Sequence, residues 1–406
     1  MVKKEKGEKM KVCGIVSEYN PFHNGHKFHI DKTREITGSE VFIAVISGNF
    51  MQRGEPAFID KWNRTKIALS SGIDLVLELP VLYSLSSAEI FAYGAVSLLN
   101  SLNSVDYISF GSESGDIDSL LKIAKILSYE TEDYKIKLKE GLNKGLPFHK
   151  SREIAIGTSI DDSLLNQISN PNNILGIEYI KSLLRLDSNI TPVTIKRIGS
   201  GYNQQDIADD YSSAAAIRKV LENNEDISLV KGSMPNNAYE ILKQLLDGGY
   251  NISDKEKMLP FIRYKLYMNQ HGINNIPEVI EGLDKKILKE IEKTSLNELI
   301  LSVKSKRYTY TRIARILTQY FIGFEGYDIS NLRKSPCPYA RILGANENGR
   351  RLIRHIKGKA VIPILNKLPN ILNPVLDLEV KSTKAYSLIN NNISPKDDYL
   401  KKPIII

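Results

Sequence analysis

Apolar runs the length of strands alternate with amphipathic stretches in the first half of the chain. The strand-like runs are Val12–Ser17, Val41–Ser47, Asp74–Leu79, Tyr107–Phe110 and Thr191–Ile198. The helix-like stretches are Gly25–Ile36, Arg64–Ser71, Ser86–Leu102, Ile174–Leu186 and Ser213–Glu222. Runs that are apolar throughout indicate strands buried on both faces. The alternation predicts an α/β fold with a mostly parallel sheet, which binds ligands at the carboxyl ends of its strands.

The pattern changes after Glu222. Residues Asn223–Asn237 are rich in Asn, Gly, Ser and Pro, which is typical of a linker, and helical spacing dominates from Tyr239 to Phe321. A strand at Tyr339–Leu343, a helix at Gly349–Ile356 and a strand at Ala360–Leu365 follow. We therefore expect a disordered lead at residues 1–9, a catalytic α/β domain at 10–228 and a mainly helical domain at 229–406.

Composition narrows the class of protein. The 406 residues are 42% hydrophobic and 25% charged, which is ordinary for a globular protein of two or three domains. No apolar run reaches the ~18 residues of a membrane span, and the basic start lacks the apolar segment of a secretory signal. Two cysteines, Cys13 and Cys337, form no disulfide framework. These features predict a cytoplasmic protein without a membrane partner.

The net charge of +8 is unevenly placed. Residues 301–360 hold 13 basic and three acidic residues, an excess that favours a polyanionic partner and nucleic acid above all. Within it, Lys304–Arg315 interleaves cations with tyrosines, a pattern suited to phosphates and unpaired bases. The RNA-binding candidates are Lys304, Lys306, Arg307, Tyr308, Arg312 and Arg315. A merely solvated helix face is the alternative.

Three of the six histidines, His23, His26 and His29, lie within seven residues. A buried strand, a proline turn and then H-x-G-H precede the predicted helix. Gly25 lets a nucleotide approach the backbone, and the helix N-terminus offers free N–H groups to phosphate. His23 and His26 are candidate catalytic residues, because two imidazoles on one face can donate hydrogen bonds to phosphate oxygens during attack at phosphorus. A zinc site and a structural histidine cluster are the alternatives.

At these residues the chain resembles the nucleotidylyltransferase superfamily, with a Rossmann-like catalytic domain. The segment Tyr211–Arg218 resembles a second signature of this superfamily, although it has alanines where hydroxyl residues are usual. Ser213 also suits a simple N-cap. Longer strings resemble the bacterial tRNA(Met) cytidine acetate ligase family over nearly the whole chain. They are Glu18–His26, Gly48–Ala57, Phe110–Glu113, Asn170–Gly176 and Lys304–Tyr308.

This resemblance implies a two-step ligase. ATP, with Mg²⁺, and acetate form acetyl-AMP and pyrophosphate, and the acetyl group passes to the exocyclic amine of the wobble cytidine in elongator methionine tRNA. Besides the two catalytic histidines, it implies an ATP site made of Val16, Ser17, Glu18, Tyr19, Asn20, Pro21, Phe22, Asn24, Gly25, Lys27, Phe28, His29, Gly111, Asn172, Asn173 and Arg197.

Several of these positions have plainer interpretations. Gly111 also suits a turn, and Asn173 also suits a helix N-cap. Arg197 ends a strand, where its guanidinium can reach a phosphate. Residues after the second strand are candidates for an acetate or phosphate pocket, with a solvated face as the alternative; they are Gln52, Arg53, Lys61 and Arg64.

Other functions share parts of the pattern. A small-molecule adenylyl- or cytidylyltransferase also uses H-x-G-H, but it leaves the basic block unexplained. A non-enzymatic RNA-binding protein leaves both histidines without a role. A class I aminoacyl-tRNA synthetase pairs H-x-G-H with tRNA, but Lys304-Ser305-Lys306 lies in the wrong place for that enzyme's second lysine motif.

Overall fold

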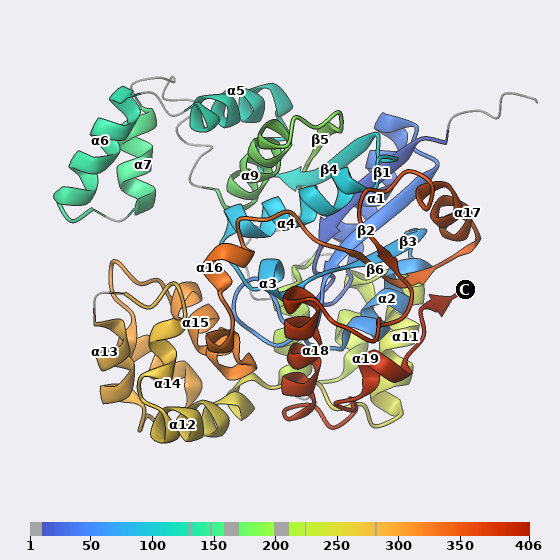
Figure 1. Cartoon of the computed structure of the whole chain (residues 1–406). Coiled ribbons are helices and arrows are strands. Elements are labelled where there is room, and N and C mark those ends of the chain that lie inside the picture. Colours follow the sequence, from blue (N-terminus) through green and yellow to red (C-terminus); the bar gives the residue numbers. More distant parts are fainter. Residues whose placement is uncertain are drawn as a thin grey trace, which may run out of the picture.

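In a computed structural model of the chain, one mixed sheet runs through the centre, with helices on both of its faces (Figure 1). The structure describes residues 10–129, 132–146, 148–157, 170–198, 211–223, 225–280 and 282–406. Within them the strands are β1 (Val12–Ser17), β2 (Val41–Ser47), β3 (Leu75–Leu79), β4 (Tyr107–Ser112), β5 (Thr191–Lys196), β6 (Ala340–Ala345), β7 (Ile364–Leu365) and β8 (Ile404–Ile405). This confirms the α/β fold with a mostly parallel sheet.

The order of the strands creates a crevice beside β1. The sheet runs β5-β4-β1-β2-β3-β6-β7, and β8 also pairs with β6. The pairs among β1 to β5 are all parallel. From β1 the chain builds outward through β2 and β3, then returns to the other side of β1 to form β4. Such a reversal leaves a gap between the connections at the carboxyl ends of the strands, where α/β proteins bind ligands.

Helices connect these strands, at the five positions predicted in the first half of the chain and at further positions that were not predicted. Those of the first half are α1 (Asn24–Thr37), α2 (Lys61–Ser70), α3 (Val81–Ser84), α4 (Ala88–Ser101), α5 (Ile117–Ser128), α6 (Glu132–Asn143), α7 (Phe148–Ile156), α9 (Pro171–Arg185) and α10 (Ala214–Glu222). Those of the second half are α11 (Asn236–Asp247), α12 (Leu259–Met268), α13 (Leu283–Glu290), α14 (Leu296–Val303), α15 (Tyr310–Ile322), α16 (Ile329–Leu332), α17 (Glu347–Ile356), α18 (Pro374–Ser387) and α19 (Asp397–Leu400). Short 3₁₀ helices are η1 (Ile227–Ser233), η2 (Lys255–Met258), η3 (Gly272–Asn275) and η4 (Phe324–Gly326).

Both faces of the sheet are buried, which explains the continuous apolar runs. Along β2, Val41, Ile43 and Val45 belong to one hydrophobic cluster, whereas Phe42 and Ala44 belong to the other. Successive side chains of a strand point to opposite faces, so a strand with cores on both sides is apolar along most of its length.

The sheet crosses the boundary that we expected near residue 229. β6 lies antiparallel beside β3, with Glu78 opposite Arg341, and β7 and β8 extend the sheet from β6. The second half is mainly helical and supplies three of the strands, of which β6 and β7 lie at predicted strands and β8 was not predicted. The expected linker at Asn223–Asn237 includes η1 and the start of α11. The predicted strand Ala360–Leu365 is shorter, since only Ile364–Leu365 pair with β6.

The helices α12 to α16 form a lobe at one side of the sheet, whereas α17 lies near the opposite side (Figure 1). Among the described residues, no helix combines the length and the apolar character needed to cross a membrane.

Candidate active site

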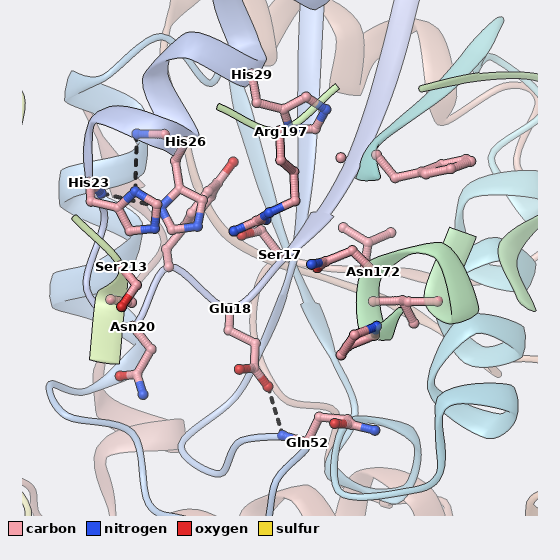
Figure 2. A pocket seen from close by; sticks show the side chains of 18 of the residues that line it. Ser17, Glu18, Asn20, His23, His26, His29, Gln52, Asn172, Arg197 and Ser213 are labelled. Atoms are coloured by element: carbon pink, nitrogen blue, oxygen red, sulfur yellow. Dashed lines mark hydrogen bonds between the residues drawn. The ribbon is translucent and has the colours of Figure 1, made fainter. Parts of the chain in front are cut away.

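A cavity of about 580 Å³ lies at the carboxyl ends of β1, β4 and β5 (Figure 2). Residues Val16–Asn20 at the end of β1 form its floor, and the N-terminus of α1 contributes histidines. Phe110, Gly111 and the segment Ile195–Ile198 form the side across the switch point. The cavity therefore occupies the position that the strand order predicts for a ligand.

The first turn of α1 holds the two H-x-G-H histidines by backbone hydrogen bonds. His23 is the N-cap, and its Nδ1 accepts a hydrogen bond of 3.0 Å from the Gly25 N–H. His26 reaches back, and its Nδ1 accepts a hydrogen bond of 3.2 Å from the His23 N–H. This reciprocal arrangement is a capping box made of imidazoles. In a neutral ring whose Nδ1 accepts, the proton is on Nε2, so each histidine has an Nε2–H donor.

Burial keeps these rings neutral. The His23 and His26 rings stack with their centroids 3.8 Å apart. Burial, helped by the nearby Arg197 guanidinium, lowers the pKa of His23 to about 3. Burial also lowers the pKa of His26 well below its ordinary value, with further contributions from His23, Arg197 and His29. Both rings are thus uncharged at pH 7 and act as hydrogen-bond donors.

The third histidine of the cluster belongs to a separate network. His29 Nε2 lies 2.9 Å from the Ser109 hydroxyl on β4, and that hydroxyl lies 2.7 Å from Thr33 Oγ1. Burial, with a smaller effect of Arg197, lowers the pKa of His29 to about 4. His29 therefore both lines the cavity and ties α1 to β4.

The strand ends across the cavity position a cation. The Arg197 N–H donates to the Ser112 carbonyl at 2.9 Å, which extends the pairing of β5 with β4, and its side chain is exposed to the cavity. A Cβ at Gly111 would lie 3.2 Å from Arg197 Cγ. Gly111 thus leaves the guanidinium room beside the histidines, where its charge can meet an anionic ligand.

The loop after β1 carries a protected carboxylate. Glu18 Oε1 accepts a hydrogen bond of 2.7 Å from the Gln52 N–H, and burial raises the pKa of Glu18 above its ordinary value. Arg218 of α10 donates to the Asn20 carbonyl at 2.7 Å. Ser213 caps α10 through the Ala216 N–H at 3.2 Å, and both Ser213 and Arg218 line the cavity. The second signature and the H-x-G-H segment therefore meet at one cavity.

Most residues assigned to the ATP site from the sequence line the cavity. They are Val16, Ser17, Glu18, Tyr19, Asn20, His23, Gly25, His26, Phe28, His29, Gly111, Asn172 and Arg197. Two of the four candidates for the acetate or phosphate pocket, Gln52 and Arg53, also line it.

The remaining ATP-site candidates lie outside the cavity wall. Phe22 is buried in the core, and Pro21 precedes it in the turn. The Asn24 amide donates to the Gly232 carbonyl at 2.7 Å, and Lys27 pairs with Asp31 on the surface of α1. These four side chains pack in the core or lie on the surface of the loop and α1, whereas adjacent residues such as His23 and His26 line the cavity.

Asn172 and Asn173 form a clasp with the turn after β4. The Glu113 carboxylate accepts hydrogen bonds from the N–H groups of Asn172 and Asn173, at 3.2 and 2.9 Å. In return, Asn173 Oδ1 accepts from the N–H groups of Glu113 and Ser114. Asn173 is fully buried, and Asn170, not Asn173, is the N-cap of α9. Asn172 lines the cavity, whereas Asn173 does not line it and instead fixes the turn after β4 by hydrogen bonds.

Lys61 and Arg64, the other two candidates for the acetate or phosphate pocket, do not line the cavity, and both side chains are buried, so they do not form a solvated face either. Arg64 donates to the carbonyls of Ile59 at 3.0 Å and Glu18 at 2.8 Å, and also to that of Gly48. It thus fixes the loops behind the cavity. Lys61 belongs to a buried ionic cluster with Glu78 and Asp398.

The RNA-binding candidates divide into an exposed and a buried group. Lys304, Lys306 and Arg307 are exposed in the loop before α15. Tyr308 is buried, with its hydroxyl donating to the Ile280 carbonyl at 2.8 Å, so it does not offer a free ring for stacking. Arg312 and Arg315 turn toward Glu278.

Several residues of the cavity wall were not among the site residues predicted from the sequence. Thr311, near the start of α15, lines the cavity although it lies more than 250 residues beyond the loop after β2 that faces it. Phe91, Tyr179 and Tyr211 add aromatic surface. Tyr211 belongs to the second signature noted in the sequence, whereas no local pattern distinguishes Phe91, Tyr179 and Thr311 from ordinary helix positions.

Comparisons with known proteins find similar sequences that cover nearly the whole chain. The model of the HIGH Nucleotidyl Transferase family matches residues 10–399. A tRNA(Met) cytidine acetate ligase of Clostridium acetobutylicum is 48% identical over 406 residues, covering 98% of this chain and 100% of that protein. One of Clostridium botulinum (strain Langeland) is 46% identical over 404 residues, covering 98% of this chain and 99% of that protein.

Solved structures match over the same length. The crystal structure of Thermotoga maritima TmcAL in its apo form I has a TM-score of 0.89 at 34% identity, covering 98% of this chain and 100% of that one. The structure of the same protein bound with alpha-thio ATP has a TM-score of 0.86 at 33% identity, again covering 98% and 100%.

Proposed function

The chain belongs to the tRNA(Met) cytidine acetate ligase family of HIGH nucleotidyl transferases, and on this premise we propose that it uses ATP to join acetate to a cytidine of tRNA(Met). The observation that carries the proposal is the pair of neutral imidazoles at the N-terminus of α1. Their Nδ1 atoms are occupied by backbone N–H groups, so both Nε2–H groups are available to an anion.

In the first step, an acetate oxygen attacks the α-phosphorus of ATP. The bond to the bridging oxygen breaks, pyrophosphate leaves with the electron pair, and acetyl-AMP remains. Acetate is ionised at neutral pH, so the step needs no general base. It needs donors for the charge that grows on the phosphate oxygens, which we assign to His23 and His26, with Arg197 as a helper.

In the second step, the exocyclic amine of the cytidine attacks the acetyl carbonyl. A carbon–nitrogen bond forms, the carbon–oxygen bond to AMP breaks, and the amine loses one proton to solvent. We propose the wobble cytidine as the acceptor, because a cytidine in the anticodon loop is unpaired and can enter a cavity. The exposed Lys304, Lys306 and Arg307, close in sequence to the cavity-lining Thr311, suit the backbone of such a loop.

Magnesium fits this scheme as a partner of the nucleotide. The described residues contain no group of three or more His, Cys, Asp or Glu side chains that could hold a metal ion. Mg²⁺ commonly binds substrate phosphates and water with few protein ligands, and it would neutralise phosphate charge in that position. Since tRNA modification requires access to tRNA, we also propose that the protein acts in the cytoplasm.

Pyrophosphate exchange with ATP tests the first step. Purified protein with Mg²⁺ and ATP is given labelled pyrophosphate and acetate, formate, propionate or amino acids, without tRNA. Exchange that depends on acetate supports formation of acetyl-AMP. Exchange with ATP that needs no carboxylic acid, or one that follows an alcohol or nucleotide substrate, contradicts it and favours a small-molecule nucleotidylyltransferase.

The second step needs its own measurement. A tRNA(Met) transcript and labelled acetate are added, and acetylcytidine is sought after nuclease digestion. Transfer to tRNA(Met), with none to a transcript whose wobble cytidine is replaced by uridine, supports the proposal. Acetate-dependent exchange without any transfer contradicts the proposed acceptor while leaving the activation step in place.

A further inference from the structure

An arginine cluster lies on the helix that borders the cavity. Arg312 and Arg315 of α15 and Arg333, just after α16, surround the carboxylate of Glu278. The nitrogen–oxygen distances are 3.7 Å for Arg312 Nε, 3.4 Å for Arg315 Nη2 and 3.9 Å for Arg333 Nη1. Good arginine–carboxylate hydrogen bonds are about 2.7–2.9 Å long. One small carboxylate thus stands loosely between three guanidinium groups.

The cluster is buried and short of acceptors. The side chains of Arg333 and Arg315 are only 7% and 11% exposed. The Nε atoms of all three arginines, and also Nη2 of Arg333, are buried without a hydrogen-bond partner among the described residues. Burying a guanidinium without a partner is costly, so buried charges are normally paired. Three cations around one anion leave two positive charges unbalanced at this position.

The location of the cluster links it to the cavity. Thr311, one residue before Arg312, lines the cavity. Thr318 donates to the Gly54 carbonyl at 2.8 Å, and a Cβ at Gly54 would lie 2.3 Å from the Arg315 backbone nitrogen. The loop after β2, whose neighbouring residues Gln52 and Arg53 line the cavity, is therefore packed directly on α15.

We propose that the arginine cluster binds a backbone phosphate of the RNA substrate, and that Glu278 occupies this site until the phosphate displaces it. A phosphate has more acceptor oxygens than a carboxylate, and it suits guanidinium groups that approach from several sides. This inference rests on the proposed function, because it names where on the protein the RNA chain is held.

The more exposed members of the cluster show how a phosphate enters. The side chains of Arg312 and Glu278 are 26% and 18% exposed, against 11% for Arg315 and 7% for Arg333. Glu278 lies between η3 and α13, where Arg312 Nη2 also donates to its carbonyl at 3.2 Å. A swing of this carboxylate outward opens the inner arginines to an anion. RNA is favoured over free pyrophosphate because neither Glu278 nor any of the three arginines lines the cavity.

Opposite substitutions test the proposal. Glu278→Gln keeps the size of the side chain but removes the competing charge, so we expect tRNA(Met) to bind about tenfold more tightly. Arg312→Gln and Arg315→Gln should each weaken binding about tenfold and reduce the slope of affinity against salt concentration by about one ion. Lys384→Gln removes an exposed cation on α18 and serves as the matched control. Affinity is measured by filter binding at several salt concentrations, with thermal unfolding as the check on folding.

The direction in which Glu278→Gln changes the affinity for tRNA(Met) distinguishes a phosphate site from a purely structural cluster. If the cluster is purely structural, Glu278→Gln lowers the melting temperature without increasing the affinity for RNA, and that result would overturn the proposal. If Arg315→Gln does not fold, the more exposed Arg312→Gln still gives the comparison. Pyrophosphate that raises the melting temperature of the wild type, but not of Arg312→Gln, with equal RNA affinities, would also overturn it. A wild type that binds no tRNA would instead contradict the proposed function.

Discussion

Two polar clusters lie at the carboxyl end of the parallel sheet, and they differ in charge and in exposure to solvent. Beside β1 and β4, neutral histidine rings face a cavity. Beside β2 and β3, ionisable side chains of both signs are packed together without exposure to solvent. Lys61 Nζ lies 2.5 Å from Glu78 Oε1 and 2.8 Å from Asp398 Oδ1, and Arg341 Nη1 lies 3.0 Å from Glu78 Oε2.

Charge compensation distinguishes the ionic cluster from the cavity. Burial raises the pKa of Glu379 to about 8, and the neighbouring Glu78 adds to this effect. Burial alone would raise the pKa of Asp398 too, but Lys61 and Arg341 lower it. At pH 7, therefore, two cations face two carboxylates and one neutral carboxyl group. Such a cluster has no charge left for a ligand, whereas the cavity offers donors that await one.

The strongest test of the comparison is to remove the central cation. Lys61→Met leaves Asp398 and Glu78 buried beside Arg341 alone. We expect the free energy of unfolding to fall by about 3–5 kcal/mol, the usual cost of breaking a buried ionic network. Urea unfolding measures it, with Lys66→Met on the exposed side of the same helix as the control. Equal, small losses for both variants would show that the cluster contributes little.

Removing a cavity donor should instead reduce catalysis. His26→Asn deletes the Nε2–H group and should lower acetate-dependent pyrophosphate exchange by about 10²–10³-fold, as loss of one transition-state donor does. The dissociation constant of ATP should change much less, since the donors act mainly on the charge that develops during attack. His355→Asn, an exposed histidine on α17, is the control. Equal losses in exchange and ATP affinity would contradict this role.

The two clusters should also respond to pH with opposite signs. The pKa of His29 in the folded state, about 4, lies below its ordinary value of 6.5, so below pH 6.5 only the unfolded chain gains this proton. The free energy of unfolding then falls as the pH decreases. The pKa of Glu379, about 8, lies above its ordinary 4.5, so stability falls as the pH rises from 4.5 to 8. Each slope is at most about 1.4 kcal/mol per pH unit.

Variants of His29 and Glu379 test whether these residues cause the two pH dependences of the free energy of unfolding. His29→Asn should flatten the loss on the acid side, and Glu379→Gln should flatten the loss on the alkaline side. Urea unfolding from pH 4.5 to 8.5 measures both. A slope that is unchanged by its variant would remove that residue from the explanation.

The smallest effect concerns the glycine between the two histidines. A Cβ at Gly25 would lie 2.8 Å from His23 Cε1, so Gly25→Ala must displace the ring and weaken its capping hydrogen bond. We expect a loss of about 1 kcal/mol in the free energy of unfolding, typical of a weakened N-cap. Pyrophosphate exchange should fall, but less than in His26→Asn. An unchanged exchange rate would show that the exact ring position matters little.

Local patterns predicted much of the fold and the histidine half of the cavity. The bounds of β1 and β2 match the apolar runs Val12–Ser17 and Val41–Ser47, because a strand buried on both faces is apolar along most of its length. The H-x-G-H segment was found because a helix start, its cap and a glycine are all encoded within a few residues.

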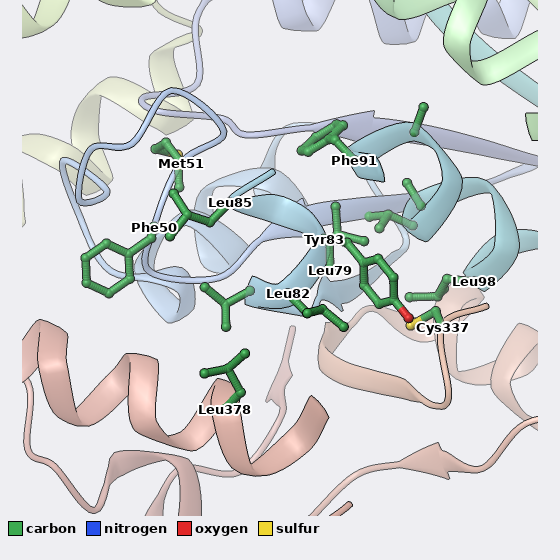
Figure 3. Packing of buried hydrophobic residues seen from close by; sticks show 14 of the residues in the cluster. Phe50, Met51, Leu79, Leu82, Tyr83, Leu85, Phe91, Leu98, Cys337 and Leu378 are labelled. Atoms are coloured by element: carbon green, nitrogen blue, oxygen red, sulfur yellow. The ribbon is translucent and has the colours of Figure 1, made fainter. Parts of the chain in front are cut away.

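Contacts between distant segments could not be predicted in the same way. Lys61 follows a strand in the same manner as a phosphate-binding residue, and its distinguishing partners come from α18 and α19. Arg315 belongs to a basic run, yet its direction depends on Glu278 in another loop. The core shows the same effect, since Tyr83 and Leu82 pack in one cluster with Cys337 and Leu378 (Figure 3). Sequence spacing does not report such pairings.

The reach of Lys61 across the chain has a consequence for synthesis. This lysine also donates to Thr383, which is 322 residues further along the chain. When β1 to β5 have been made, the strands that carry the histidine-lined cavity are present, whereas the ammonium of Lys61 still lacks Glu379, Asp398 and Thr383. Because burying that unpaired charge is unfavourable, the nascent chain has reason to leave this side of the sheet open to water. The ionic cluster can therefore pack fully only after α18 and α19 have been made, later than the strands that carry the histidine-lined cavity.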